Sequence, residues 1–342
     1  MKKTQIFLFC SLLLGVLASC NTKVDLYADY KDVPVVYGLI DVTQDTNYVK
    51  IIRAFSGSDE VSIDANQVAL IADSCNYPGK LDARLIEYKS TVGTQYNATG
   101  RVIVLDTMTI NDKQPGTFYY PNQKVYFTTE KFNIDNASTK YKYELVVVTP
   151  HDTVTAETNL VGGDRFKIIT TTMTFSPTGQ DKTGKVSFIP AENAAVYEVM
   201  LTFNYKEKKM NEAMTDKHVS WSYAGLRPDT DNLTYEEGRY YVKYNQAILF
   251  NMLGSAIEAD TLNVERYIGT FEISVVAGGR ELNNYVQINS PSEGFSQTIP
   301  DYTNINGGYG VFSSRINLNA TAVLSAKTQT DLIGMNWGFK QR

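Results

Sequence analysis

The stretch Lys140-Tyr-Lys-Tyr-Glu-Leu-Val-Val-Val-Thr149 decides the fold class, because it alternates lysine with tyrosine and then continues in apolar β-branched residues. Successive side chains of a strand point to opposite faces, so the alternation places charges on one face and rings on the other. That is the pattern of a sheet with one face in water. The stretch therefore predicts a half-buried β-strand.

Segments of the same kind extend in both directions from this strand. They are short, rich in β-branched and aromatic residues, and bounded by Gly, Asn, Asp or Pro, which is typical of strands. No amphipathic helix separates those in the first half, which favours antiparallel sandwiches over alternating strands and helices. The predicted strands are 33–42, 47–55, 67–72, 101–106, 124–129, 168–175, 185–203, 264–277 and one near 310–314.

The sequence predicts two β-sandwich domains that meet near the Gly162-Gly163 pair. Residues 34–160 are expected to form an immunoglobulin-like or transthyretin-like sandwich. Residues 161–342 are expected to form a second sandwich, because residues 185–203 resemble two successive strands of a fibronectin type III domain. One helix is expected near 241–258, where residues such as Tyr244, Ala247 and Ile248 recur at offsets of three and four.

The first twenty residues resemble the signal of a bacterial lipoprotein. Met1-Lys2-Lys3 precedes an apolar stretch from Ile6 to Leu17, which is too short for a membrane-spanning helix of about twenty residues. The ending Leu17-Ala-Ser-Cys20 resembles a lipobox, at which the cysteine thiol receives a lipid before cleavage. We expect residues 1–19 to be removed, Cys20 to be acylated and residues 20–33 to form a tether, which anchors the protein without a transmembrane helix.

Charge and cysteine content exclude two kinds of protein. Loss of residues 1–19 removes two lysines and no acid, so 30 basic residues would face 37 acidic ones and the net charge of −5 would become −7. Such a body has no electrostatic footprint for nucleic acid. Of the three cysteines only Cys75 would remain unmodified, so no disulfide framework is expected. Cys75 is interpreted as a small buried residue rather than a nucleophile.

No catalytic set, cofactor or metal is expected. The only two histidines, His151 and His218, lie in different predicted domains and in no catalytic motif. The acidic stretch Asp229–Glu237 offers oxygen ligands for calcium but lacks EF-hand spacing, so a surface loop is the preferred interpretation. The clusters at Gly278-Gly279 and Gly307-Gly308 are interpreted as turns or bulges.

Tyrosine is abundant, with 23 copies, and some lie in or near predicted loops. Rings on loops give a binding surface large contact area at low entropic cost. The alternative is that they are cross-strand pairs within the sheets. The candidates for ligand-facing rings are Tyr119, Tyr120, Tyr240, Tyr241 and Tyr302.

Two segments resemble a family of uncharacterised outer-membrane lipoproteins of Bacteroidota. The first is Val35-Val-Tyr-Gly-Leu39, and the second is Tyr302-Thr-Asn-Ile305 with Gly307-Gly-Tyr-Gly-Val-Phe312. The resemblance implies a β-rich protein of the outer membrane, often encoded beside TonB-dependent receptors, and no assigned activity. In physical terms the second segment predicts a tight glycine turn, after which Val311 and Phe312 return to the core.

Three functions follow as hypotheses. The first is a non-enzymatic binding or accessory protein on the outer membrane, facing the periplasm or the surface, whose partner is a TonB-dependent receptor or a surface complex. The second is a surface adhesin or a structural component of the envelope. The third is a hydrolase driven by a pair of carboxylates, which a structure would show as two facing acids in a cleft.

Overall fold

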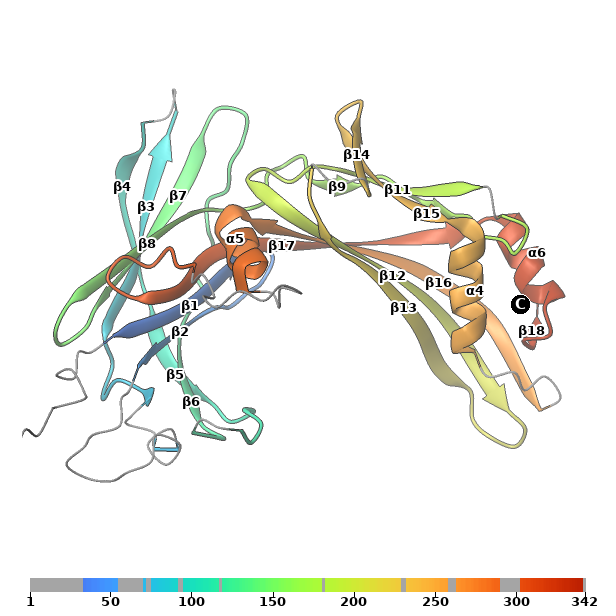
Figure 1. Ribbon diagram of the computed structural model, residues 1–342, viewed down its shortest axis with the longest axis horizontal. Coiled ribbons are helices and arrows are strands. Elements are labelled where there is room, and N and C mark those ends of the chain that lie inside the picture. Colours follow the sequence, from blue (N-terminus) through green and yellow to red (C-terminus); the bar gives the residue numbers. More distant parts are fainter. Residues whose placement is uncertain are drawn as a thin grey trace, which may run out of the picture.

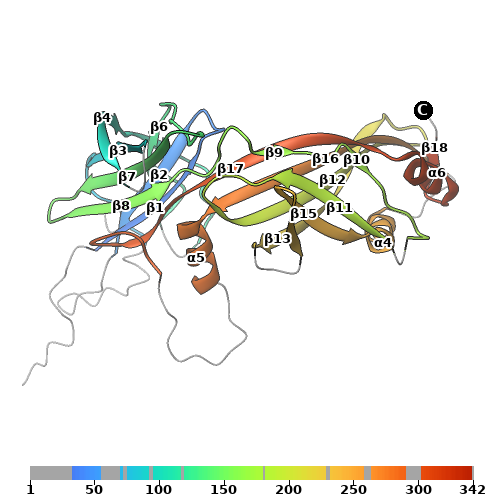
Figure 2. The ribbon, with the colours of Figure 1, turned by 90° about the horizontal axis from the view of Figure 1, so that it is seen from above.

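The computed structural model describes residues 33–54, 70–71, 75–91, 95–116, 119–179, 182–228, 232–257, 263–289 and 302–340. Over these residues the chain is mainly β, as expected, and most strand pairs are antiparallel. The molecule is elongated and has two lobes, and long strands run between them (Figures 1 and 2). The expected signal peptide and nearly all of the tether lie outside the described residues.

One large sheet runs through the whole molecule. In spatial order it contains β13 (Thr215–Leu226), β12 (Ala194–Lys209), β16 (Val264–Gly279), β17 (Tyr309–Leu324), β1 (Pro34–Asp41), β2 (Asn47–Arg53), β6 (Gln123–Thr128) and β5 (Asp106–Ile110). Two short strands, β10 (Thr172–Met173) and β18 (Phe339–Lys340), pair with β17 and β16. Strands from both predicted domains therefore contribute to this one sheet.

Two smaller sheets cover opposite ends of the large one (Figure 1). In the first lobe, β4 (Asn97–Val104), β3 (Asp82–Ser90), β7 (Lys140–Val148) and β8 (Thr153–Asn159) pack against β1, β2, β6 and the start of β17. In the second lobe, β14 (Leu233–Glu236), β15 (Arg239–Asn245), β11 (Thr183–Ile189) and β9 (Lys167–Ile168) pack against β12, β13 and β16.

Each lobe has its own hydrophobic core, and the two cores divide between Leu160 and Val161. The first core draws on residues 36–160 and also on Ile305 and Phe312. The second core draws on residues between Val161 and Phe339. The two cores therefore divide near residue 160, except that a C-terminal segment with Ile305 and Phe312 also belongs to the first lobe.

That C-terminal segment joins the first lobe through a parallel pair of strands. β17 runs beside β1 from Val35↔Tyr309 to Asp41↔Arg315. The two sequence segments of the family resemblance, far apart in the chain, are thus strand partners. The side-chain amide of Asn304 accepts a hydrogen bond from Phe312 N (2.9 Å) and donates one to Phe312 O (2.7 Å), which fixes the start of β17.

Glycines allow the close approach of β1 and β17. A Cβ at Gly308 would lie 2.6 Å from Pro34 O, and a Cβ at Gly38 would lie 2.7 Å from the Phe312 ring. Phe312 is fully buried in the first core, as expected. Val311 is also buried but lies on the opposite face of the sheet, so its expected return to the core is wrong. Gly310 was expected in a tight turn, but it lies inside β17, because only glycine fits against the Val36 carbonyl there.

The helix expected over 241–258 begins later than predicted. Residues 239–245 form β15, in which Val242 and Tyr244 face the second core, and α4 extends over Gln246–Ala256. The Asn245 side chain caps α4 by accepting hydrogen bonds from the Ala247 and Ile248 amides at 3.0 Å each. Tyr240, Val242 and Tyr244 alternate with polar neighbours or Tyr241, which fits the period of a strand. The Asn245 cap then marks the boundary between β15 and α4.

Two further helices were not expected. α5 (Arg280–Asn289) follows β16 directly, so Gly278-Gly279 is a strand end and not a turn. Both glycines lie where a Cβ would press on neighbours, Gly278 against Leu282 and Gly279 against Ser313. α6 (Ala326–Gly334) is capped by Ser325. None of the described helices has both the length and the apolar character that a membrane crossing requires.

One predicted strand is wrong in the part that can be assessed. Leu70 and Ile71, from the expected strand 67–72, are exposed and lie outside any strand, while the other four residues lie outside the described part of the chain. Six strands among the described residues, β3, β5, β8, β13, β14 and β18, were not expected.

Candidate functional site

The large sheet has an outer face in the first lobe, turned away from the core. Because side chains alternate along a strand, Val36 and Ile51 point into the core while Val35, Lys50 and Ile52 point outward. Cross-strand register places Ile52 beside Val35. We call this surface of β1, β2, β6 and the first half of β17 the outer face.

A cavity of about 350 Å³ opens on the outer face at the end of β2. Its floor is formed by β1 and β2, and its walls come from the chain before β3 and from the β5–β6 connection. We call it the outer-face pocket. Its lining residues are Val35, Lys50, Ile52, Arg53, Ala54, Cys75, Asn76, Lys113, Tyr119, Asn122 and Gln123.

The pocket combines apolar walls with positive charge. Its described lining residues include three cations, Lys50, Arg53 and Lys113, and no carboxylate. Lys50 Nζ donates to Gln123 Oε1 at 2.9 Å, and Lys113 Nζ donates to the carbonyl oxygen of Tyr119 at 2.8 Å. Both of these acceptors are neutral oxygens, which orient the two ammonium groups.

The position of Lys50 in the pocket disfavours its charged form. Burial, followed by repulsion from Lys113, lowers the pKa of Lys50 from 10.5 to about 8. Burial also raises the pKa of the Cys75 thiol, although the charges of Lys113, Lys50 and Arg53 oppose that rise. Cys75 is therefore held as a buried thiol, as the sequence indicated, and forms part of the pocket wall.

Removal of the half-buried lysine gives the first testable prediction. Because the folded-state pKa of Lys50 lies below its ordinary value, the unfolded chain binds more protons between about pH 8 and 10.5, and stability should rise with pH there. Lys50→Met should raise the Tm at pH 7 by about 2–4 °C and remove that rise. Thermal melts of both proteins from pH 7 to 10.5 measure this, and a lower Tm for the variant would contradict it.

A second hollow continues the outer face beyond Lys50, which lines both spaces. α5 lies along it, near β17 and β1 (Figure 2). The Tyr285 ring meets Tyr37 edge-on at 6.2 Å between centroids. Burial, together with the Tyr285 hydroxyl, raises the pKa of Tyr37 to about 12. Tyr37 and Tyr48 remain 41% and 44% exposed, so the pocket opens beside a surface of tyrosine rings.

The structure separates the five candidate tyrosines rather than gathering them into one site. Tyr119 forms a wall of the outer-face pocket, and Tyr120 beside it is exposed. Tyr240 and Tyr241 lie within β15 of the second lobe, not in a loop, and Tyr240 packs on aromatic rings there. Tyr302 is half-buried before β17. Cys75 was interpreted from the sequence as a small buried residue, and the remaining members of the pocket were not singled out.

The other residues considered from the sequence are the expected lipidation site, the acidic stretch 229–237 and the two histidines. Cys20 and residues 229–231 lie outside the described residues. Glu236 and Glu237 belong to the β14–β15 hairpin, where Glu236 pairs with Lys185 at 3.6 Å. His151 and His218 are exposed in different lobes. Within the described part of the chain, no group of three or more His, Cys, Asp or Glu residues is arranged to hold a metal.

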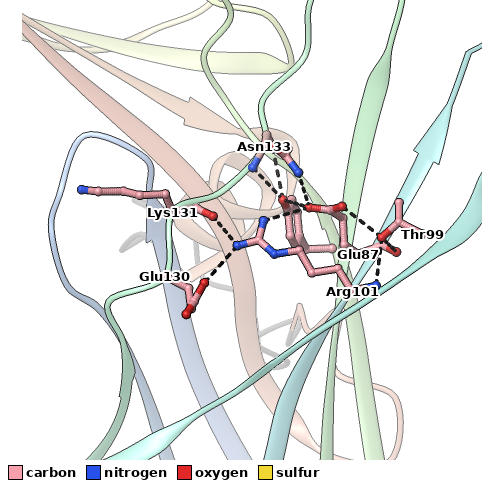
Figure 3. Close-up of polar contacts among 7 residues, drawn as sticks. Glu87, Thr99, Arg101, Glu130, Lys131 and Asn133 are labelled. Atoms are coloured by element: carbon pink, nitrogen blue, oxygen red, sulfur yellow. Dashed lines mark hydrogen bonds and ion pairs between the residues drawn. The ribbon is translucent and has the colours of Figure 1, made fainter.

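A network of polar contacts around the buried Glu87 carboxylate lies inside the first lobe (Figure 3). The Glu87 carboxylate accepts hydrogen bonds from Tyr143 Oη (2.6 Å), Asn133 Nδ2 (2.8 Å) and Thr99 Oγ1 (3.0 Å). Arg101 Nη1 lies 3.2 Å from the same carboxylate. All of these contacts are within the protein, so the network anchors the chain after β6 to β3, β4 and β7.

A second buried pair fastens the C-terminal segment to the second lobe. Arg266, with no exposed surface, donates from Nε to Glu207 Oε2 at 2.9 Å and from Nη1 to Trp337 O at 2.6 Å. The pair joins β12 and β16 to the turn before β18. Like the Glu87 network, it is made of contacts within the protein. Among the described cavities, we take the outer-face pocket as the candidate site because its walls are largely apolar and carry three cations.

Comparison with protein-family models and with curated proteins gave no match for this chain.

Proposed function

We propose that the chain is a non-enzymatic binding protein of the bacterial outer membrane, anchored by acyl chains on Cys20, with the outer face of the first lobe as its binding surface. It would act as an accessory of a TonB-dependent uptake system or another surface complex. The observation that carries the binding role is the outer-face pocket, an apolar cavity with three cations in its described lining, beside exposed tyrosines. Such a combination is typical of ligand sites.

The lobes are proposed to be variants of known sandwiches, immunoglobulin-like or transthyretin-like for the first and fibronectin type III-like for the second. The layering of two sheets around each core supports this. The parallel strand β17, which the two lobes share, departs from both patterns.

The anchor has its own test. In cells of the native host, Cys20→Ser should move the protein from the membrane fraction to the soluble fraction, because two or three acyl chains hold a protein stably while the bare chain has no comparable anchor. Fractionation and mass spectrometry of the N-terminal peptide measure this. Cys75→Ser is the matched control and should stay on the membrane. A membrane-bound C20S protein would refute the anchor.

Partner binding is tested by photo-crosslinking from single positions in the full chain. A photoreactive amino acid at Tyr48, on the outer face, should crosslink to an outer-membrane transporter or surface protein in intact cells. The control carries the same photoreactive amino acid in place of Tyr235, which is also exposed but lies on the second lobe. This protein should give no such product. Equal crosslinking from both positions, or none from Tyr48, would contradict the assignment of the outer face.

A further inference from the structure

The second hollow on the outer face has a volume of about 500 Å³, which lies within the range of small-molecule sites. Its floor is made mainly of side chains from β1, β2 and β17 that point away from the first core, and Leu282 of α5 forms part of one wall. β1 pairs with β2 on one side and with β17 on the other. A ligand in the hollow would therefore meet mainly side chains, because strand pairing occupies the backbone groups of the floor.

Tyrosine rings form the flat, apolar part of the hollow. Tyr37 lines it from β1 and Tyr48 from β2, and both rings keep exposed surface. The Tyr285 ring of α5 meets Tyr37 edge-on, which restrains the plane of the Tyr37 ring. The two rings offer contact area at low entropic cost to a ligand with a flat apolar face.

Two buried polar side chains, Asp41 and Asn47, line the same hollow and are 3% and 5% exposed. Asn47 Oδ1 accepts a hydrogen bond from Asp41 N at 2.6 Å, so Nδ2 lies on the other branch of the amide, where it forms no hydrogen bond within the described part of the chain. Asp41 Oδ1 accepts from the amide and the hydroxyl of Thr43, at 3.0 and 2.6 Å. Asp41 Oδ2 accepts no hydrogen bond from the described residues. The hollow thus holds a donor and an acceptor that are fixed by burial.

Arg315 supplies further donors beside Asp41. The register of β1 and β17 places the two residues opposite each other, and Arg315 Nε lies 3.4 Å from Asp41 Oδ2 in an ion pair. The two charges offset each other, so this end of the hollow favours a neutral polar ligand. The Arg315 side chain is 48% exposed, and its other N–H groups can donate to a ligand oxygen. Lys50, the third charged residue that lines the hollow, lies at the end shared with the outer-face pocket.

We propose that the second hollow binds a neutral oligosaccharide, with one pyranose ring against Tyr37 and Tyr48. The hydroxyls of that ring accept from Arg315 and Asn47 and donate to Asp41 Oδ2. A pyranose has an apolar C–H face and a rim of hydroxyls, each of which both donates and accepts, so it matches aromatic rings that adjoin a carboxylate and N–H donors. The inference rests on the proposed binding role of the outer face and names its ligand class.

The ligand class is tested with the full-length protein in a polyoxyethylene detergent, which carries no sugar. The protein is titrated calorimetrically with maltotetraose, cellotetraose, β-1,4-mannotetraose and β-1,4-xylotetraose, and with glucitol, which has hydroxyls but no ring. We expect at least one tetrasaccharide to bind at one site per chain with a Kd of about 0.1–1 mM. Glucitol should bind at least tenfold more weakly, because an open chain offers the tyrosine rings no flat face. Comparison of the four tetrasaccharides identifies the preferred sugar and linkage.

Variants tie the binding to the second hollow. Tyr48→Ala should weaken tetrasaccharide binding tenfold or more, whereas Tyr48→Phe keeps the ring and should stay within about twofold of the parent protein. Arg315→Met should also weaken binding tenfold or more. Tyr235→Ala, which removes an exposed ring from the second lobe, is the matched control and should bind like the parent protein. Thermal melts show whether each variant is folded, and Arg315→Lys, which keeps the charge beside Asp41 but has fewer donors, replaces the methionine variant if that one does not fold.

Three results would overturn the proposal: no saturable binding of any of the four tetrasaccharides, equal affinity for glucitol, or undiminished binding by the Tyr48→Ala and Arg315 variants. These outcomes are separable from failure of the proposed function. Crosslinking from Tyr48 to a membrane partner without tetrasaccharide binding would remove the ligand class and keep the binding face. Tetrasaccharide binding without a crosslinked partner would keep the ligand class and remove the accessory role.

Discussion

Replacing Gly310 with alanine is expected to destabilise the protein by at least about 3 kcal/mol, because two independent penalties coincide at one buried position. The backbone of Gly310 has φ +108°, a region that side chains rarely adopt. A Cβ there would also overlap the carbonyl oxygen of Val36, so β17 would have to move away from β1. The register from Val35↔Tyr309 to Asp41↔Arg315 depends on that contact.

The control is a glycine that has the strained backbone conformation but no close neighbour. Gly100, in β4 of the same lobe, has φ +85°, and a Cβ added there would meet nothing within 4 Å, so Gly100→Ala should cost only about 1–3 kcal/mol. Urea unfolding measures both changes, and hydrogen exchange should show the G310A loss first in β1 and β17. Equal destabilisation by the two variants would mean that the β1–β17 approach contributes nothing beyond backbone strain.

The β1–β17 pair also marks the limit of what the sequence could predict about the fold. Period-two alternation identified most strands, including β7 and β12, because each strand carries its own pattern of burial. Pairing of residues about 270 apart leaves no local pattern, so the shared sheet was not predicted. The segments Val35–Leu39 and Tyr302–Phe312 were noted separately in the sequence, and nothing in either one indicated that β1 and β17 are strand partners.

Boundaries between a strand and a helix were the other difficulty. Tyr244, Ala247 and Ile248 fit a helical period, yet Tyr244 also alternates with Val242 as a strand does. The interaction that separates the two is the Asn245 cap, and an asparagine within a continuous pattern gives a weak signal. α5 has a narrow apolar stripe, with Leu282, Tyr285 and Val286 at offsets of three and four, but it is short and follows β16 directly, so it was not expected.

The candidate site was predicted only in part, because it is assembled from four separate segments. Tyr119 was singled out as a ring near a loop. Lys50 and Cys75 were interpreted by their local surroundings, as a strand residue and a small buried residue. Their placement around one cavity follows from the course of the chain after β2 and after β5. The sequence around Lys50 and around Lys113 does not indicate that either lysine lines a cavity.

The second large effect is expected at Glu87. Glu87→Gln should destabilise the protein by about 2–4 kcal/mol at pH 7, because Arg101 and three neutral donors lose a charged acceptor in a buried network. Glu144→Gln is the matched control: Glu144 accepts one bond from Tyr88 at 2.7 Å in a less buried position of the adjacent strand, and should cost less than about 1 kcal/mol.

The pH dependence distinguishes a charge effect from a simple change of shape at Glu87. Burial alone would raise the pKa of this carboxyl, but hydrogen bonds from Tyr143, Asn133 and Thr99 and the charge of Arg101 hold it below its ordinary value of 4.5. A carboxyl with a depressed folded-state pKa stabilises the fold above its unfolded value, and that contribution is lost as the pH falls through the folded one. The difference in unfolding free energy between parent and E87Q proteins should therefore be constant above about pH 5.5 and shrink below pH 4.5. Urea unfolding at pH 7, 5.5 and 3.5 measures it, and a difference that stays the same at all three would show that the variant acts through packing instead of the carboxylate charge.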